Sequence, residues 1–311
     1  MIVNFEDKLT ELKNLISEAG IDALEELKQL ETKIHASSKS EIAWKRVELA
    51  RHSERPYSLD YIRRIFDDFT ELHGDRAFGD DAAIVGGLAF LDGRPVTILA
   101  NQKGRTLKEN MHRNYGMANP EGYRKALRLA KEAEKFSRPI ISFIDTSGAY
   151  PGIGAEERGI GEAIARNLRD FSQLKTPIVC VIIGEGGSGG ALGLCVGDKI
   201  YMLENAIYSV ISPEGCASIL LRDAARAKDA AAMLRITSED LLAFNVINGV
   251  IDEPAGGAHA DPDAAAASIK EILLRDIADL KARNPSVLVR YRNQKILKIG
   301  HWNESSCDQK D

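Results

Sequence analysis

Apolar residues recur at the spacing of an α-helix through much of the first 53 positions. This spacing is seen at Leu9, Leu12, Leu15 and Ile16, and again at Leu24, Leu27 and Leu30. Because Glu and Lys fill the positions between them, the pattern predicts a pair of amphipathic helices that pack on a neighbour. We expect a break near His35 and a second helix from about Glu41. Arg55-Pro56-Tyr57 ends the region, since proline disfavours helix in the residue before it.

From Leu59 onward the pattern changes to helices alternating with short apolar strands. The expected helices are Leu59 to His73, Tyr123 to Phe136, one beginning near Ala155, Ile160 to Phe171, Ala191 to Cys195, and Ala264 to Arg283. The expected strands are Ala83 to Phe90, Pro95 to Ala100 after an Asp92-Gly93 hairpin turn, Ile140 to Ile144, Ile178 to Ile183, Lys199 to Leu203, and Ala206 to Ile211. This alternation predicts an α/β fold whose helices cover a largely parallel sheet. A polar, mobile tail follows His301.

Composition and charge exclude several classes of protein. The net charge of -5 carries no polybasic signature, so nucleic acid or an anionic membrane is not expected as the main partner. The longest apolar run, Ile178 to Ile183, is far too short to span a bilayer, and Met1 to Thr10 has no apolar signal-peptide core. Cys180, Cys195, Cys216 and Cys307 form no CxxC pair. We therefore expect a reduced, cytoplasmic protein without a metal site.

Two strands are each followed by a glycine-rich turn into a helix. The first turn is Asp145-Thr146-Ser147-Gly148-Ala149-Tyr150-Pro151-Gly152, and the second is Gly184-Glu185-Gly186-Gly187-Ser188-Gly189-Gly190-Ala191. The first N–H groups of a helix lack internal partners, and glycine lets a ligand approach the backbone. Paired N–H groups at such a place stabilise an oxyanion. One turn of this kind is often only structural, but two at the carboxyl ends of adjacent strands favour function.

Three other interpretations of the turns remain open at this stage. Gly186 to Gly190 matches the G-x-S-x-G motif of serine hydrolases, with Ser188 as nucleophile and Asp252 and His259 in the right chain order. Gly184, Gly186 and Gly189 also match the dinucleotide motif G-x-G-x-x-G, with Glu204 as a ribose-binding acid, although the helix before Lys199 is too short for an ordinary crossover. In the third interpretation, the protein is a non-catalytic scaffold and the glycine-rich turns have only a structural role.

Several segments together resemble the alpha subunit of bacterial acetyl-coenzyme A carboxylase carboxyltransferase, almost continuously from about Leu49 to His259. The resemblance is carried by Asp145 to Gly161, Gly184 to Ala191, YSVISPEGCASI at Tyr208 to Ile219, Arg55-Pro56-Tyr57, Ile84 to Gly87, Gln102 to Arg105, and Pro120 to Arg128. Ser147 departs from the family pattern, which has proline there, so this turn is expected to be less rigid. The predicted helices at the N-terminus match the family only in their type of structure.

The resemblance implies a crotonase-like fold, a spiral of ββα units, and a carboxyl transfer from carboxybiotin on its carrier protein to acetyl-coenzyme A. The product would be malonyl-coenzyme A, in the first committed step of fatty acid biosynthesis. Another acyl-coenzyme A enzyme of the same fold is the nearest alternative. The expected parts are an N-terminal helical segment (1–55) for subunit contact, a carboxyltransferase domain (56–290) and a C-terminal tail (291–311). The expected partners are a beta subunit in an alpha2beta2 heterotetramer, the biotin carboxyl carrier protein and biotin carboxylase, which uses ATP.

The resemblance also implies roles for particular residues. Gly189 and Gly190 map onto the glycines whose N–H groups hold the biotin carbonyl, flanked by Gly186 and Gly187. Gly148 and Ala149 are the second choice for backbone donors, and we expect a bulky residue at Gly190 to block biotin without disturbing the fold. Lys103 and Arg105 either contact coenzyme A phosphates or form a solvated face.

Three further residues have simpler interpretations. Helix-dipole stabilisation accounts for Glu156 and Glu157 at the start of a helix. Cys216 is expected to be a small buried residue and not a nucleophile.

Overall fold

The computed structural model describes residues 39–300, and the predicted helix before His35 and the tail after His301 lie outside them. A helix covers residues 39–50, as expected from Glu41 onward. The other helices are α3 (Ser58–Ile65), α4 (Leu107–His112), α5 (Pro120–Lys135), α6 (Ile153–Glu157), α7 (Ile160–Phe171), α8 (Ser188–Leu192), α9 (Pro213–Cys216), α10 (Ala227–Leu234), α11 (Ser238–Ala243), α12 (Pro262–Lys281) and α13 (Pro285–Leu297). Short turns of other helix types are η1 (Asn114–Gly116), η2 (Ala217–Leu221) and η3 (Ala224–Arg226).

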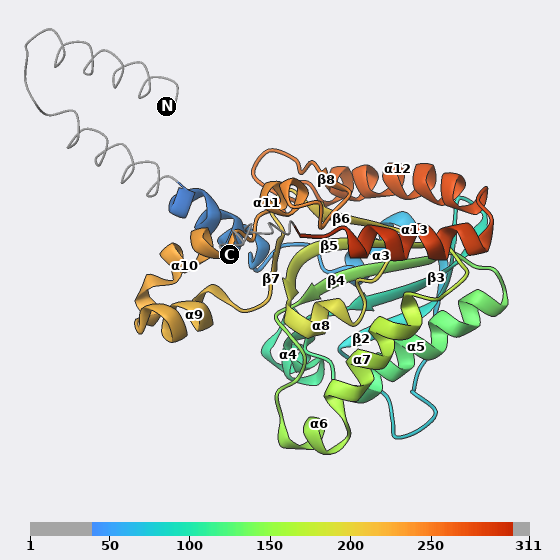
Figure 1. Ribbon diagram of the computed structural model, residues 1–311, viewed down its shortest axis with the longest axis horizontal. Coiled ribbons are helices and arrows are strands. Elements are labelled where there is room, and N and C mark those ends of the chain that lie inside the picture. Colours follow the sequence, from blue (N-terminus) through green and yellow to red (C-terminus); the bar gives the residue numbers. More distant parts are fainter. Residues whose placement is uncertain (1–38, 301–311) are drawn as a thin grey trace, which may run out of the picture.

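One eight-stranded sheet forms the centre of the molecule (Figure 1). Its strands are β1 (Asp67–Glu71), β2 (Ile84–Leu91), β3 (Arg94–Asn101), β4 (Ile140–Thr146), β5 (Ile178–Gly187), β6 (Lys199–Leu203), β7 (Ile207–Ser209) and β8 (Gly249–Ile251). The order is β1-β2-β3-β4-β5-β6-β8, with β7 paired to the end of β5. The first two pairings are antiparallel and the rest are parallel, so the predicted largely parallel sheet is confirmed.

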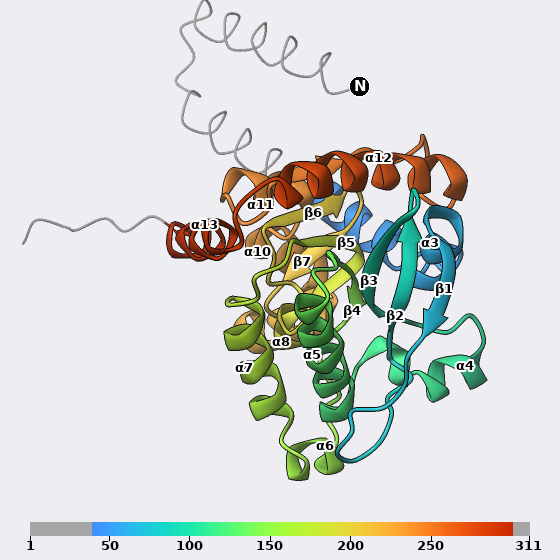
Figure 2. The same cartoon turned by 90° about the vertical axis from the view of Figure 1, so that its right-hand side faces the viewer.

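Helices cover both faces of the sheet, which explains why every residue of β4 is buried. Leu129 of α5 packs over Gly86 of β2 on one face, where α5 also lies against α7. Tyr61 of α3 stacks on Phe143 of β4 on the other face, and α12 packs against α3 (Figure 2). Strands buried on both faces are expected to be continuously apolar, and Ile178 to Ile183 has that pattern.

The helix at 39–50 packs on α10 and on β7, away from the main core. Ala43 and Val47 from the helix meet Ile207 and Ala231 in a separate apolar cluster. Figure 1 shows these helices beside α9 at one end of the molecule, where β7 leaves the sheet. The helix at 39–50 is therefore tied to the same end of β5 that carries the second glycine-rich turn.

Several predicted boundaries differ from the structure. The helix expected from Leu59 to His73 ends at Ile65, and β1 follows it, because Asp67 to Glu71 runs along the edge of the sheet. The strand β5 continues to Gly187, four residues beyond Ile183, and α8 begins at Ser188 rather than Ala191. Sequence reasoning missed α13, which follows α12.

Candidate active site at the glycine-rich turns

The two glycine-rich turns touch each other backbone to backbone. A β-carbon added at Gly187 would overlap the carbonyl group of Ser147, and one added at Gly190 would overlap the backbone of Gly148. Both glycines are thus required for the close approach of the turns, as the structural interpretation expects. The prediction that a bulky side chain at Gly190 leaves the fold undisturbed is therefore wrong.

Gly189 and Gly148 differ from these two packing glycines. A β-carbon at Gly148 would have no atom within 4 Å, and one at Gly189 would meet only Ile164, at 3.7 Å. Neither residue is needed as glycine for the contact between the turns. Their Cα atoms leave room for a ligand to reach the backbone.

Backbone N–H groups at the junction of the turns are free to donate. We find no acceptor within residues 39–300 for the N–H of Ala149, Gly189 or Gly190. The last two lie in the first turn of α8, where a helix has no internal acceptor. The N–H of Gly148 donates weakly to Oγ1 of Thr146, at 3.2 Å. Free backbone donors of this kind can stabilise an oxyanion.

A mostly apolar pocket of about 340 Å³ opens beside Gly189. Its lining comes from α8, β7 and the segment around α11, namely Ser188, Gly189, Leu192, Tyr208, Ser209, Val210, Leu241 and Val246. Burial raises the pKa of the Tyr208 hydroxyl, so this group stays protonated. A pocket of this kind fits a compact, largely apolar ring system whose polar atom points at the N–H groups.

A chain of charges lies beneath the turns and was not foreseen. Nζ of Lys103 contacts Asp145 at 2.7 Å and Glu185 at 3.0 Å, and Arg51 contacts Glu185 at 2.8 Å and Glu214 at 2.7 Å. Oδ1 of Asp145 also accepts the N–H of Glu185. Asp145 begins the first turn and Glu185 lies in the second, so Lys103 joins the two.

Burial and the neighbouring charges shift the pKa values of Glu185 and Lys103. Burial alone would raise the pKa of Glu185, but the charges of Lys103 and Arg51 lower it to about 2. Burial opposes the charge on Lys103, yet Asp145 and Glu185 raise its pKa above the usual value. Glu185 and Lys103 are therefore charged at neutral pH, and their ion pair supports the two turns.

Lys103 and Arg105 have other partners than the phosphates that we considered for them. Lys103 is committed to Asp145 and Glu185, as described above. Arg105 contacts Asp60 at 2.6 Å, donates to the carbonyl oxygen of Ser53, and lies 4.0 Å from the centre of the Tyr57 ring. Both side chains join protein elements around the site.

The structure does not assemble the triad of the hydrolase hypothesis. Ser188 has a φ of 49°, as a nucleophile elbow would, but it makes no hydrogen bond with His259. The His259 ring stacks on His52 at 3.8 Å, and burial lowers its pKa. Asp252 is exposed, while the neighbouring Glu253 is held by Arg55. No base is therefore placed to activate Ser188.

The structure does not support the hypothesis of a dinucleotide-binding site either. Its glycines lie partly in β5 and partly in α8, a helix of five residues. Glu204 contacts Arg46 at 3.0 Å instead of facing a ribose site. This geometry lacks the long helix of a dinucleotide-binding crossover.

Glu156, Glu157 and Cys216 lie as the sequence predicted. Glu156 lies in the first turn of α6, and both Glu156 and Glu157 are exposed. Cys216 is buried. None of the helices within residues 39–300 has the length and apolar character needed to cross a membrane. Sequence reasoning missed Arg51 and Glu185, although the charge of Glu185 just after the apolar run Ile178 to Ile183 was a usable signal.

The chain is similar to carboxyltransferases over nearly its whole length. Residues 1–300 match the family described as acetyl co-enzyme A carboxylase carboxyltransferase-like. The acetyl-coenzyme A carboxylase carboxyl transferase subunit alpha of Treponema denticola is 67% identical, over 95% of this chain and 97% of that protein. The protein of the same name from Listeria welshimeri is 53% identical, over 96% of this chain and 95% of that protein.

Solved structures of other carboxyltransferases and decarboxylases share the fold. Transcarboxylase 12S has a TM-score of 0.55 and 24% identity, covering 68% of this chain and 40% of its own. A Pseudomonas malonate decarboxylase hetero-tetramer has a TM-score of 0.57 and 19% identity, covering 69% of this chain and 86% of its own. The predicted crotonase-like fold is confirmed by these likenesses.

Proposed function

The chain belongs to the acetyl-coenzyme A carboxylase carboxyltransferase family, and on that premise we propose that it is the alpha subunit, which supplies the biotin side of the carboxyl transfer to acetyl-coenzyme A. The observation that carries the assignment of the site is the set of free N–H groups at Ala149, Gly189 and Gly190, next to an apolar pocket. Ser188 lies beside them, but within residues 39–300 it forms no hydrogen bond with a histidine that could activate it. The chemistry therefore rests on backbone donors.

Gly189 and Gly190 would hold the biotin carbonyl, with the rings of biotin in the pocket beside Gly189. The ureido group of biotin supplies the oxygen on which negative charge develops when its carboxyl group leaves, and paired donors stabilise that charge. Gly186 and Gly187 set the path of the backbone into this turn. Gly148 and Ala149 add a donor from the first turn, which Lys103 holds in place.

The second oxyanion, on the thioester of acetyl-coenzyme A, would be held by a beta subunit. The name of the relatives as subunit alpha supports a second kind of subunit. We propose an alpha2beta2 heterotetramer that receives biotin on its carrier protein after a biotin carboxylase has loaded it. In this proposal residues 1–55 contact a partner.

A reconstitution assay tests this function. The purified chain is mixed with a beta subunit of a carboxyltransferase, and malonyl-coenzyme A formation from carboxylated biotin carrier protein is measured. We expect turnover with both subunits and none with either alone. Turnover by this chain alone would contradict the proposal. A stable complex of the two subunits that forms no malonyl-coenzyme A would contradict it as well.

A further inference from the structure

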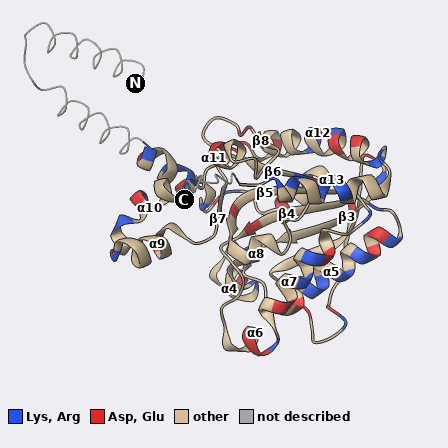
Figure 3. Ribbon diagram, viewed as in Figure 1, with Lys and Arg blue, Asp and Glu red and all other residues tan. Residues whose placement is uncertain are grey.

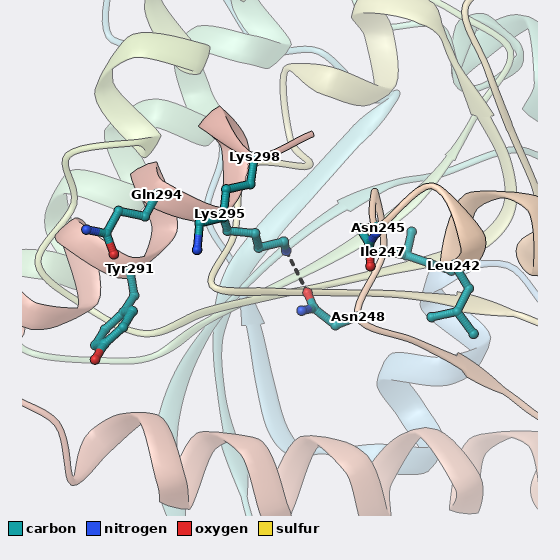
Figure 4. A pocket seen from close by; sticks show the side chains of 8 residues that line it. All are labelled: Leu242, Asn245, Ile247, Asn248, Tyr291, Gln294, Lys295 and Lys298. Atoms are coloured by element: carbon teal, nitrogen blue, oxygen red, sulfur yellow. Dashed lines mark hydrogen bonds between the residues drawn. The ribbon is translucent and has the colours of Figure 1, made fainter. Parts of the chain in front are cut away.

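A second pocket, of about 530 Å³, lies between α13 and the segment that follows α11 (Figure 4). It is lined by Leu242, Asn245, Ile247, Asn248, Tyr291, Gln294, Lys295 and Lys298. No residue of this lining also lines the pocket beside Gly189. The pocket is therefore a separate feature, and the proposed carboxyl transfer gives it no role.

One face of α13 forms a wall of the pocket. Tyr291, Gln294, Lys295 and Lys298 follow one another at intervals of three, one and three residues, which places them on the same side of a helix. Leu288 and Arg292 adjoin this face and are buried against the body of the protein. The helix thus presents an aromatic ring, an amide and two ammonium groups toward the pocket together.

Positive charge is in excess here, although the whole chain has a net charge of -5. The sequence of α13 contains no Asp or Glu, and Figure 3 shows Lys and Arg along it. Asp198 is bound by Arg292 through two contacts, of 2.8 and 3.0 Å. Among the described residues, neither Lys295 nor Lys298 forms an ion pair.

Lys295 is held in position by a neutral group. Its Nζ donates to Oδ1 of Asn248 at 2.6 Å, and that oxygen also accepts the N–H of Ile200 at 2.8 Å. Burial lowers the pKa of Lys295, while the charge of Asp198 opposes this shift; Asp198 is bound by Arg292 and forms no ion pair with Lys295. An anion in the pocket would supply the missing countercharge.

We propose that this pocket binds a nucleoside phosphate. Its volume exceeds what an inorganic anion needs and suits a molecule of nucleotide size. Lys295 and Lys298 would bind the phosphate, and charge-assisted hydrogen bonds of this kind are strong. The Tyr291 ring with Leu242 and Ile247 offers a face for a base, whose edge could bond the side-chain amides of Asn245 and Gln294.

The phosphate could come from a free nucleotide or from the adenosine end of a larger substrate such as coenzyme A, and the chemistry of recognition is shared. Calorimetric titration of the full chain at low ionic strength distinguishes the sources. The ligands are adenosine 3′,5′-bisphosphate, adenosine, inorganic pyrophosphate, ATP and coenzyme A. We expect saturable binding of the bisphosphate, and weaker binding of adenosine and of pyrophosphate, because each lacks one half of the recognised group.

Variants test whether binding occurs in this pocket. We expect Lys298→Ala and Lys295→Met each to weaken the bisphosphate about tenfold or more, the usual effect of losing a hydrogen bond to a charged group. Lys281→Ala removes the same charge from the exposed end of α12 and should leave affinity unchanged. Tighter binding of coenzyme A than of ATP would indicate that the pocket belongs to a substrate site. Tighter binding of ATP would indicate that it binds a free nucleotide.

Several results would overturn the proposal. One is the absence of saturable binding for every phosphate ligand. Another is equal weakening in Lys281→Ala, which would show attraction to general surface charge. Equal affinity for pyrophosphate and the bisphosphate would show that the pocket does not recognise the nucleoside. Thermal unfolding of each variant without ligand checks that α13 remains folded.

Discussion

At the scale of single residues, neighbouring glycines in the second turn have different physical roles. Gly190 is glycine because the backbone of Gly148 occupies the place of a side chain, whereas Gly189 has free space there. A glycine-rich motif in a sequence does not reveal this difference. It depends on the distance between two turns that lie about 40 residues apart in the chain.

The two glycines therefore predict opposite effects of the same substitution. We expect Gly190→Ala to destabilise the protein by about 1–3 kcal/mol, the usual cost of overpacking, and to abolish carboxyl transfer because the turns must separate. Gly189→Ala should fold with nearly wild-type stability, since its methyl group meets Ile164 at ordinary contact distance. Thermal unfolding and the reconstituted assay measure both effects. Equal stability of the two variants would show that the turns are not in contact.

Ser188 provides a second test at this scale. Because no histidine contacts it, we expect Ser188→Ala to keep carboxyl transfer within about tenfold of wild type. Loss of a true nucleophile costs several orders of magnitude. The malonyl-coenzyme A assay and labelling by a fluorophosphonate probe report on the two alternatives. A large loss of rate together with labelling at Ser188 would restore the hydrolase hypothesis.

At the scale of elements, the chain of charges beneath the turns joins segments that are distant in sequence. Arg51 follows the helix at 39–50, Lys103 follows β3, Asp145 ends β4, and Glu185 lies in β5. A buried charge that loses its partner is costly, so each member depends on the others. The support of the active-site turns thus includes the end of the N-terminal helix.

The low pKa of Glu185 predicts a dependence of stability on pH. A carboxyl group whose pKa falls from 4.5 to about 2 on folding contributes on the order of 3 kcal/mol above pH 4.5, and this contribution is lost as the pH falls through about 2. We expect Glu185→Gln to be less stable at pH 7 and to lose less further stability between pH 4.5 and 2. Urea unfolding across this range measures the difference.

The control for this prediction is Glu156→Gln, which removes an exposed carboxylate in α6 that forms no ion pair within residues 39–300. It should follow the wild-type stability curve. If Glu185→Gln follows the same curve, Glu185 is not held by Lys103 and Arg51 in solution.

Element by element, the sequence predicted strands better than the segments between them. Ile140 to Ile144 and Ile178 to Ile183 are continuous apolar runs, which only a strand covered on both faces explains well. The strand β1 was missed because Asp67 to Glu71 is an edge strand with polar side chains, and its pairing with β2 is a long-range contact. The partners of Lys103 were missed for the same reason, since Asp145 and Glu185 come near it only in the folded chain.

At the scale of the whole molecule, one end remains incompletely covered. Large apolar side chains are exposed there at Val210, Ile219, Leu220 and Met233, each with at least 60% of its surface accessible. Val210 also lines the pocket beside Gly189. A subunit seated on this surface would close the biotin pocket and bring its own oxyanion donors to the turns. The free N–H groups and the exposed apolar residues thus both support the proposal that a partner completes the site.

The last prediction tests this surface directly. We expect the double substitution Ile219→Asp and Leu220→Asp to prevent association with the beta subunit, because two charges would be buried without partners in the complex. The chain itself should remain folded, since both residues are already exposed in η2. Leu107→Asp in α4, a residue that is 69% exposed elsewhere, is the matched control and should assemble normally. Gel filtration of the mixed subunits measures assembly, and malonyl-coenzyme A formation should disappear only where assembly does. If the double variant forms the complex with wild-type affinity, the beta subunit binds another face and the site must be completed from there.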